Sequence, residues 1–373
     1  MDHKLPTLED IPDLSGIKVL LRAPLNVPIK DGRVVNDFRL ERTLKTVAYL
    51  TERGARVIMI GHIGREKVET LEPVHKALAE HITLAWCDEI MTPKMHAMAD
   101  ALHDGEVLLL ENLRSHDGET ANDPHFAAEL ASLAAVYVND AFSVSHREHA
   151  SVVGIPKLLP SYAGMTFMQE VTELGKARKP EHPSLFILGG AKFETKEPLI
   201  AEFLETYDRV FVGGAIANDF YKADGLEVGV SQVSKGVVPE SVVHHPHISL
   251  PERVVVKKAD GSRETKSFDA VEAEEAILDG VFPESLLAGV KTVLWNGPIG
   301  YYEGGYDEGT VATAMLLSKT GAYTVVGGGD TIAAIERLGL NDTFNFVSTA
   351  GGAMLTFLEE GTLPGIEALL KSK

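Results

Sequence analysis

The sequence predicts an α/β protein with parallel sheets, and three observations support this. Short apolar runs alternate along the whole chain with segments of helical spacing. The runs are nearly continuous in apolar residues, which is typical of strands buried on both faces of a parallel sheet. At 373 residues, the chain also exceeds the usual size of one hydrophobic core, so we expect two domains.

Nine apolar runs are expected to be strands. In chain order they are "KVLLRA", "ARVIMIGH", "EVLLLENLR", "AAVYVNDAF", "SLFILGGA", "DRVFVGGAIA", "KTVLWNGP", "YTVVGGGD" and "FNFVSTAGG". Between them, the leucine and valine stripe of "RLERTLKTVAYLTERGA" predicts a helix that stops at Gly54. Asp123 and Pro124 are expected to be the N-cap and first residue of another helix. Alternating residues around Asp260-Gly261 predict an antiparallel hairpin at the edge of the second sheet.

A domain boundary is predicted where a helical stretch from Met165 to about Arg178 is followed by two prolines and a new strand. The simplest architecture is two Rossmann-like halves joined by this helix. We expect a first domain over residues 1–164, a helix and linker over 165–182, and a second domain over 183–347.

Composition excludes several classes of protein. The formal net charge of -19 argues against a nucleic-acid groove or a surface for anionic membranes, because either would have to form against the protein's own field. The one cysteine, Cys87, lies in an apolar run, which predicts a buried residue in a reducing compartment. No window approaches the roughly 20 apolar residues of a membrane helix. We therefore expect a cytoplasmic protein with small-molecule ligands.

Polar and basic residues follow the expected strands of the first half. Ligands bind beyond the carboxyl ends of the strands in an open parallel sheet, so these residues are expected to share one crevice. An isolated surface arginine is most often only solvated, but clustered cations repel one another and are tolerated when an anionic ligand binds them. We predict a site for a small phosphorylated carboxylate. Its candidate residues are Asn26, Arg39, His62, Arg65, Arg114, His146, Arg147 and His149.

The expected strands of the second half end in glycine instead. Glycine lets backbone N–H groups approach a ligand closely, and the N-terminus of a following helix favours anions. Tight strand-to-helix turns explain any one of these clusters, whereas four in succession favour a nucleotide site. The clusters are Gly189-Gly190, Gly213-Gly214, Gly297 and Gly327-Gly328-Gly329.

No common nucleotide motif accompanies these glycines, since neither GxxxxGK[ST] nor GxGxxG follows an expected strand. Lys192 and Lys196 are spaced to share one face at the start of a helix, where two cations can hold phosphate oxygens. Asp330 suits a helix N-cap, a carboxylate that reaches Mg²⁺ on a nucleotide phosphate, or both roles at once. Gly351 and Gly352 begin a predicted amphipathic helix, whose free N–H groups suit a phosphoryl group during transfer.

The ordered set of these segments resembles the phosphoglycerate kinase family from about Val19 to Leu369. The matching stretches are "LRAPLNVP", "NDFRL", "GHIGR", "LLLENLR", "YVNDAFSVSHREHASVVG", "GGAKFETK", "WNGPIGYYE", "GGGDT" and "STAGGAMLTFLEEGTLPG". The resemblance implies two domains with parallel sheets that face each other across a cleft, with the acid substrate on the first and Mg-ADP or Mg-ATP on the second. It also implies hinge bending, and a C-terminal segment, residues 348–373, that packs back on the first domain.

The activity that the resemblance implies is reversible phosphoryl transfer between 1,3-bisphosphoglycerate and ADP, giving 3-phosphoglycerate and ATP in glycolysis and gluconeogenesis. We expect a cytoplasmic monomer without nucleic-acid or membrane partners. The acid substrate is expected to bind at Asn26, Arg39, His62, Ile63, Gly64, Arg65, Arg114 and Arg147. The nucleotide is expected to bind at Gly190, Lys192, Lys196, Gly214, Asn296, Pro298, Glu303, Gly328, Gly329, Asp330 and Thr331, with Glu303 near the ribose and Asp330 at the magnesium ion.

The expected mechanism depends on charge rather than on proton transfer. The acceptor oxygen is already ionised at neutral pH, so the reaction needs no general base. Repulsion between anions and the charge on the transferring group oppose the reaction. The groups expected to offset this charge are the side chains of Arg39, Lys192 and Lys196 and the backbone N–H groups of Gly351 and Gly352.

The sequence departs from the family pattern at Pro24, at Ala350, and at Gly61 and Glu66, which flank "HIGR" where the pattern has serine and proline. Pro24 stands in "LRAPLNVP" where the pattern has an aspartate, so a carboxylate that would accept a hydrogen bond from the substrate hydroxyl is missing. We expect this to weaken substrate binding or to relax substrate selectivity, by about 1 to 3 kcal/mol. Ala350 replaces a glycine and is expected to restrict the backbone near the phosphoryl position. The charged residues are all present, so we expect the chemistry to survive.

Three other interpretations stay open. Pro24 and Ala350 motivate a non-catalytic nucleotide-binding protein of the same fold, although such a protein would not need the complete set of cations. A dinucleotide-dependent dehydrogenase on a doubly wound sheet is opposed by the missing GxGxxG. A purely structural interpretation, with glycine turns and solvated arginines, leaves the shared location of these residues at strand ends unexplained.

Overall fold

The computed structural model describes residues 4–372, apart from the side chain of Thr195, and the chain divides into two compact units. Unit 1 runs to Thr172 and resumes at Thr362, whereas unit 2 spans Glu173–Gly361. The first division falls inside the helix predicted between the two halves. The last helix of the chain therefore belongs to unit 1, and the helix before it belongs to unit 2.

Unit 1 contains a six-stranded sheet in which all neighbouring strands are parallel, in the order β5-β6-β4-β1-β7-β8. The four central strands are predicted apolar runs, and nearly all of their residues are buried because both faces of the sheet are covered. The edge strands β5 and β8 were not predicted, since one alternates in exposure and the other is short. The strands are β1 (Lys18–Arg22), β4 (Arg56–Ile60), β5 (Leu84–Cys87), β6 (Val107–Leu110), β7 (Val136–Asn139) and β8 (Ser161–Ala163).

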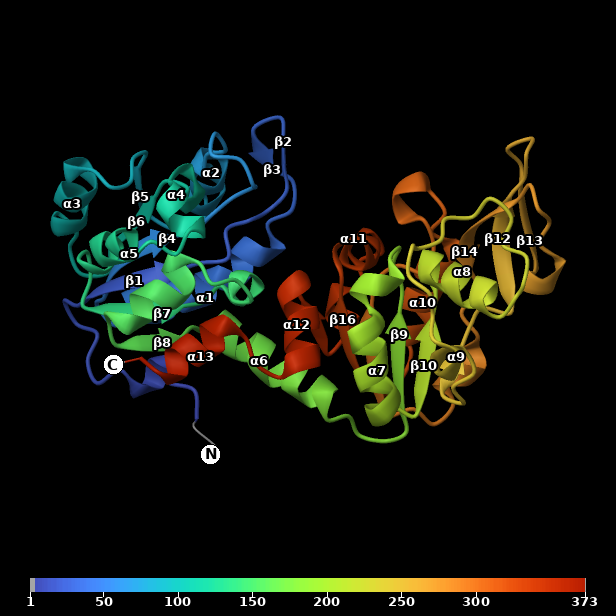
Figure 1. Ribbon diagram of the computed structural model, residues 1–373. Helices are drawn as coiled ribbons and strands as arrows, with labels where there is room; N and C mark the ends of the chain where they lie inside the picture. The colour runs from blue at the N-terminus through green and yellow to red at the C-terminus, as the bar shows by residue number, and fades with distance from the viewer. Residues whose placement is uncertain (1–3, 373) are drawn as a thin grey trace. The chain divides into compact units, whose positions relative to one another are not determined.

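The helices of unit 1 pack around this sheet (Figure 1). Gly54 has a φ of 79° just after α1, as the predicted stop requires. Asp123 is the N-cap of α5, where its Oδ1 accepts hydrogen bonds from the N–H groups of His125 and Phe126. The helices are α1 (Phe38–Thr51), α2 (Glu72–Ala79), α3 (Pro93–Asp100), α4 (Asp117–Thr120), α5 (Pro124–Ala131), α6 (Met165–Arg178) and α13 (Pro364–Leu370), and a hairpin joins β2 (Ile29–Lys30) to β3 (Arg33–Val34).

Unit 2 repeats the architecture with a second all-parallel sheet, in the order β11-β10-β9-β15-β16-β17. Five of its strands are the remaining predicted runs, and only the two-residue β11 was missed. The strands are β9 (Ser184–Leu188), β10 (Arg209–Val212), β11 (Ile248–Ser249), β15 (Thr292–Asn296), β16 (Tyr323–Gly327) and β17 (Phe346–Ser348). The helices are α7 (Glu197–Thr206), α8 (Gly214–Ala223), α9 (Glu240–Val243), α10 (Glu308–Leu317), α11 (Gly329–Arg337) and α12 (Gly352–Glu360).

The predicted hairpin around Asp260-Gly261 is present, but it does not extend the parallel sheet. It joins β12 (Arg253–Lys257) to β13 (Arg263–Ser267), and β14 (Ala276–Gly280) pairs with β12 on the other side to form a separate antiparallel sheet. Apolar residues of this small sheet pack against Ala217 and Tyr221 of α8. Burial against a helix, rather than edge pairing, therefore determines where the hairpin lies.

Two further sequence expectations concern the single cysteine and membrane-spanning helices. Cys87 is buried at the end of β5, and burial raises the pKa of its thiol, which suits a structural residue rather than a nucleophile. Of the helices between residues 4 and 372, none has both the length and the apolar character that a membrane span requires.

Candidate functional site

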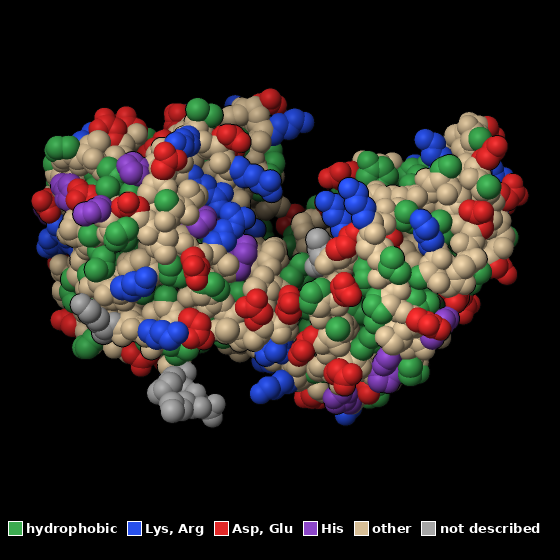
Figure 2. Space-filling model, in the orientation of Figure 1, with side chains coloured by type: hydrophobic (Ala, Val, Ile, Leu, Met, Phe, Trp, Pro, Cys, Tyr) green, Lys and Arg blue, Asp and Glu red, His purple; other side chains and the backbone are tan. Residues whose placement is uncertain are grey.

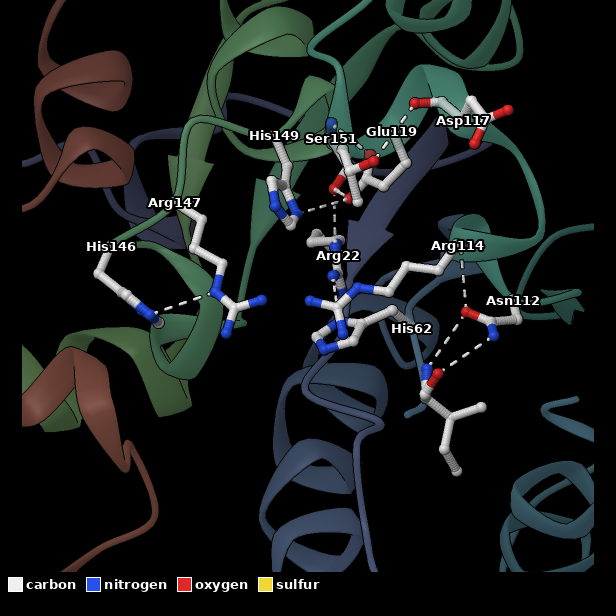
Figure 3. A network of polar contacts seen from close by, with 12 residues as sticks. Arg22, His62, Asn112, Arg114, Asp117, Glu119, His146, Arg147, His149 and Ser151 are labelled. Carbon is white, nitrogen blue, oxygen red and sulfur yellow. Dashed lines mark hydrogen bonds and ion pairs between the residues drawn. The ribbon is translucent and has the colours of Figure 1, made fainter. Parts of the chain in front are cut away.

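The carboxyl ends of four adjacent strands in unit 1 bring cationic side chains together. β6, β4, β1 and β7 are neighbours, and their register places Arg22 between the last residues of β4 and β7. His62, Arg114 and Arg147 follow β4, β6 and β7 at the same edge of the sheet. Figure 3 shows the guanidinium groups of Arg114 and Arg147 pointing toward each other beside the His62 ring. In Figure 2, Lys and Arg side chains gather on this face of unit 1 next to histidines.

This cluster keeps positive charge partly out of water. Only 6% of His62 and 7% of Arg114 is exposed. Burial first, and then the nearby guanidinium of Arg147, lowers the pKa of Arg114 to about 10. The pKa of His62 lies well below its usual range, because burial and then Arg22 and Arg114 disfavour the imidazolium. His62 is therefore neutral at pH 7, and the arginines carry the charge of the cluster.

Arg114 has donors without acceptors in the part of the chain that the structure describes. Its Nη1 donates to the carbonyl oxygen of Gly64, but its buried Nε and Nη2 atoms have no hydrogen-bond partner. A buried N–H group without an acceptor is costly. A carboxylate or phosphate can satisfy both groups, since a guanidinium binds such anions through parallel hydrogen bonds. The arrangement is thus suited to an anionic ligand.

The "HIGR" turn that carries the predicted substrate residues is held by two asparagines. The Asn112 side chain accepts a hydrogen bond from the N–H of Ile63 at 3.2 Å and donates to the carbonyl oxygen of Ile63 at 3.1 Å. Asn26 Oδ1 accepts from the N–H of Gly64 at 2.9 Å. Gly64 has a φ of 61°, and a Cβ there would overlap the carboxylate of Glu69, so the turn requires glycine. These hydrogen bonds hold the turn next to Arg114.

Of the two other predicted arginines, Arg39 lies on α1, and Arg65 lies on the same turn as His62. Arg39 is the second residue of α1, and burial lowers the pKa of its guanidinium. Its Nη1 donates to the carbonyl oxygen of Asn26. Arg65 is exposed on the turn, where its backbone N–H donates to the Glu69 carboxylate at 2.5 Å. Asn26 therefore connects Arg39 to the turn that carries Arg65.

Sequence reasoning missed the residues behind the cluster. Arg22 is fully buried at the end of β1, and its Nε donates to Ser151 Oγ at 2.9 Å. Glu119, also fully buried, accepts from the N–H and the Oγ of Ser151 at 2.9 and 2.6 Å. An arginine that ends an otherwise apolar run was a usable signal for Arg22. Glu119 gave none, because it lies in the polar segment "DGETANDP".

The glycine turns of unit 2 pack backbone against backbone. A Cβ on Gly189 would lie 2.0 Å from the carbonyl oxygen of Pro298, and a Cβ on Gly214 would lie 2.6 Å from that of Gly190. Gly214 and Gly190 also have φ values of 64° and 122°. These turns therefore require glycine for structural reasons whatever they bind, so their number alone is weak support for a ligand site.

A cavity of about 420 Å³ beside these turns is stronger support. Of the predicted nucleotide residues, Gly190, Pro298, Glu303 and Asp330 line it. An apolar cavity of this size with a few polar groups is typical of a small-molecule site. A cavity of about 470 Å³ in unit 1, beside β3 and α2, contains none of the predicted site residues. The lining residues of the unit 2 cavity that sequence reasoning missed are Ala191, Ala215, Gln232, Ile277, Leu278, Gly300, Tyr301 and Tyr302.

Lys196 lies directly before α7, and its Nζ donates to Asn296 Oδ1 at 3.1 Å, at the carboxyl end of β15. Burial lowers the pKa of its ammonium group to about 8. Lys192 is exposed on the other side of a single 3-10 turn, Phe193–Thr195. The prediction that the two lysines share one face of an α-helix is therefore wrong. The partly buried Lys196 is an ammonium group that a phosphate would stabilise.

Asp330 and Thr331 lie in the first turn of α11. The helix begins at Gly329 with Gly328 as its N-cap, so the predicted N-cap role of Asp330 is wrong. Burial first, and then the negative charge of Glu303, raises the pKa of Asp330. Thr331 is fully buried, and its Oγ1 has no hydrogen-bond partner among residues 4–372. Both side chains retain unused capacity to bind a ligand or an ion.

The other predicted anion site lies at the start of α12. Gly352 is the first residue of this helix, and Gly351 is its N-cap with a φ of 57°. Both glycines are exposed, and the space that a Cβ of Gly351 would occupy is open. Ala350, where the family pattern has glycine, is buried. The predicted contact of these N–H groups with a phosphoryl group stays a prediction.

Comparisons with known proteins agree over nearly the whole chain. The family model described as phosphoglycerate kinase matches residues 8–361. Curated phosphoglycerate kinases from Moorella thermoacetica and Thermus thermophilus are 40% and 42% identical over 97% of this chain, which covers 98% and 99% of their lengths. Solved structures of phosphoglycerate kinases from Coxiella burnetii and Pyrococcus horikoshii match with TM-scores of 0.83 and 0.86 at 33% and 29% identity. Each match covers 98% of this chain, with 99% and 98% of the solved chains. The chain belongs to the phosphoglycerate kinase family and is a kinase with the glycolytic role of that family.

Proposed function

We propose that unit 1 binds 3-phosphoglycerate or 1,3-bisphosphoglycerate, that unit 2 binds ADP or ATP, and that the phosphoryl group is transferred reversibly between them. The observation that carries the proposal is Arg114, whose buried Nε and Nη2 lack acceptors. The substrate offers a carboxylate and a phosphate to this cluster. Asn26, Arg39, His62, Ile63, Gly64, Arg65 and Arg147 complete the proposed substrate site.

The cavity of unit 2 supports the proposed nucleotide site. Its apolar and aromatic lining residues suit a base, and Glu303 and Asp330 add two carboxylates to the lining. We place the phosphates near Lys192, Lys196 and the glycine turns, since the lowered pKa of Lys196 leaves an ammonium group that an anion would stabilise. Gly190, Gly214, Asn296, Pro298, Gly328, Gly329 and Thr331 complete this site.

The donor set fits a magnesium ion on the nucleotide. Mg²⁺ is bound in kinases through one or two carboxylates together with substrate phosphates and water. Asp330 lines the cavity and supplies one such carboxylate. When bound, the ion would neutralise charge on the phosphate oxygens.

The residues of the chain act by binding, orienting and excluding water. The acceptor oxygen is already ionised, so no side chain has to remove a proton. Arg39, Lys192 and Lys196 would offset the charge of the transferring group, and the N–H groups of Gly351 and Gly352 would receive its equatorial oxygens. Transfer requires that the two ligands meet, so we propose hinge bending between domains over residues 1–164 and 183–347. Of the segment 348–373, the part from Thr362 onward would pack on the first domain, whereas α12 belongs to unit 2. We propose a cytoplasmic monomer.

The proposal is tested by a coupled assay for ATP-dependent turnover of 3-phosphoglycerate, together with calorimetric titrations of each ligand. Arg114→Gln is expected to weaken 3-phosphoglycerate binding by about 10- to 100-fold, because it removes charge-assisted hydrogen bonds, and to leave ADP binding unchanged. Arg53→Gln, which removes an exposed guanidinium at the far end of α1, is the matched control. Unaltered 3-phosphoglycerate binding in Arg114→Gln would overturn the substrate site. Turnover by the unmodified chain would exclude the non-catalytic alternative.

A further inference from the structure

His62 is held by a side chain that can only donate hydrogen bonds. Arg22 Nη2 lies 2.7 Å from His62 Nδ1. A guanidinium has five N–H donors and no acceptor, and it keeps its proton in proteins. The contact is therefore a hydrogen bond only if His62 Nδ1 offers a lone pair. In a neutral imidazole, the ring proton then lies on Nε2.

The Arg22 guanidinium is held in place on every side. It is fully buried, its Nη1 donates to the carbonyl oxygen of Ala23 at 2.8 Å, and its Nε donates to Ser151 Oγ at 2.9 Å. Ser151 Oγ in turn donates to Glu119 Oε1 at 2.6 Å. The hydroxyl therefore connects the buried cation to a buried carboxylate, which offsets its charge. Figure 3 shows this sequence of contacts running from Glu119 through Ser151 to Arg22.

The surroundings of His62 oppose a second proton on the ring. Arg22, the last residue of β1, contacts the His62 ring. Arg114 lies on the segment after β6, and Arg147 and His149 lie on the segment after β7. The buried carboxylate of the network is already engaged, since Glu119 accepts from Ser151 and lies 3.7 Å from His149 Nδ1. Burial and these four basic side chains hold the pKa of His62 well below its usual range.

We propose that Arg22 is a positioning residue that fixes His62 as its neutral Nε2–H tautomer, so that His62 offers the acid substrate one hydrogen-bond donor and no charge. The substrate part of this inference rests on the proposed function. Arg114 and Arg147 then attract the anion through their positive charge, whereas His62 orients the anion through one hydrogen bond. Substrate affinity should accordingly show no titration of His62 between pH 6 and 8.

The tautomer is tested on the unmodified chain without any ligand. The protein is labelled with ¹⁵N-histidine, and the His62 signals are identified by their loss in His62→Gln. At pH 7 we expect an unprotonated Nδ1 and a protonated Nε2, with no titration near the ordinary pKa of about 6.5. A protonated Nδ1, or titration near the ordinary pKa of about 6.5, would overturn the inference.

Arg22→Met tests the role of the arginine, and Arg42→Met is the matched control, because Arg42 is a second buried arginine of unit 1 that pairs with Glu170. If Arg22 fixes the tautomer, the His62 signals of Arg22→Met should show both tautomers, whereas those of Arg42→Met should not change. Identical tautomer populations in Arg22→Met and the unmodified chain would overturn the role of Arg22. If Arg22→Met does not fold, the measurement on the unmodified chain still decides the tautomer.

The substrate part is tested by titrating 3-phosphoglycerate into His62→Gln and Arg147→Gln at two salt concentrations and at pH 6 and 8. His62→Gln is expected to weaken binding by up to about tenfold, as for one hydrogen bond from a neutral donor, with an unchanged salt dependence. Arg147→Gln is expected to reduce the salt dependence, because it removes a charge. A reduced salt dependence in His62→Gln would show that His62 carries charge and would overturn the inference. Unaltered affinity in His62→Gln would instead refute the proposed substrate contact, while leaving the tautomer result in place.

Discussion

The lowered pKa of Lys196 predicts that nucleotide binding takes up a proton at alkaline pH. Burial lowers the pKa of this ammonium group from the ordinary 10.5 to about 8. A bound phosphate would favour the charged form and raise the pKa again, since an opposite charge within a few ångströms stabilises the ammonium ion. The side chain would therefore be partly neutral in the free protein and fully protonated in the complex.

The size of the effect can be worked out from the two protonation states. With a pKa of about 8, roughly three quarters of Lys196 is neutral at pH 8.5 and roughly one tenth at pH 7. If ADP returns the pKa toward 10.5, binding should take up about 0.7 proton at pH 8.5 and about 0.1 proton at pH 7. ADP itself is fully ionised at pH 8.5, so it contributes little to this difference.

Titration calorimetry in buffers with different enthalpies of ionisation measures this number directly. The observed heat of ADP binding at pH 8.5 should vary with the buffer in the unmodified chain and should not vary in Lys196→Met. Lys319→Met, which removes an exposed lysine of unit 2, is the control and should behave like the unmodified chain. A heat that is independent of the buffer at pH 8.5, or the same uptake in Lys196→Met, would show that Lys196 does not take up this proton.

Four other substitutions have expected outcomes. Burial raises the pKa of Asp140 to about 7, so the folded state holds a proton that the unfolded state releases above its ordinary pKa, and stability falls as pH rises from about 4 to 7. Asp140→Asn should remove up to about 1.4 kcal/mol per pH unit of this slope in urea unfolding, and equal slopes would contradict it. Gly189→Ala should destabilise the protein by about 2 kcal/mol or more, because its Cβ would meet the Pro298 carbonyl oxygen at 2.0 Å. Gly175→Ala, with open space in α6, should stabilise it by about 0.5 to 1 kcal/mol in the same assay. Pro24→Asp should lower the Michaelis constant for 3-phosphoglycerate by roughly 5- to 150-fold, and an unchanged constant would show that the missing carboxylate does not matter.

Local composition was enough to identify the strands of the two parallel sheets apart from β5, β8 and β11, and most of the polar residues and glycines that follow these strands. A continuous apolar run such as that of β1 or β15 can bury all its side chains only inside a sheet covered on both faces, so no long-range information was needed. The basic residues that follow the strands of unit 1 and the glycines that follow those of unit 2 could be identified from the sequence for the same reason. The family resemblance was also carried by local motifs, and the comparisons confirm it.

Strand order and long-range packing determine the contacts between distant residues, the cavity of unit 2 and the shifted pKa values. The contact between Arg22 and His62 joins the ends of two paired strands, and the one between Glu119 and Ser151 joins segments 32 residues apart. The lining of the unit 2 cavity includes Ile277 and Leu278 of β14, a strand that was not predicted. This strand pairs with the β12-β13 hairpin, which local periodicity had placed at an edge of the parallel sheet. Burial sets the lowered pKa values of His62 and Lys196 and the raised pKa of Asp330, and burial depends on which elements cover a residue. Side-chain periodicity reports the environment of one element only, so these contacts and ionisation states exist only once the sheets are assembled.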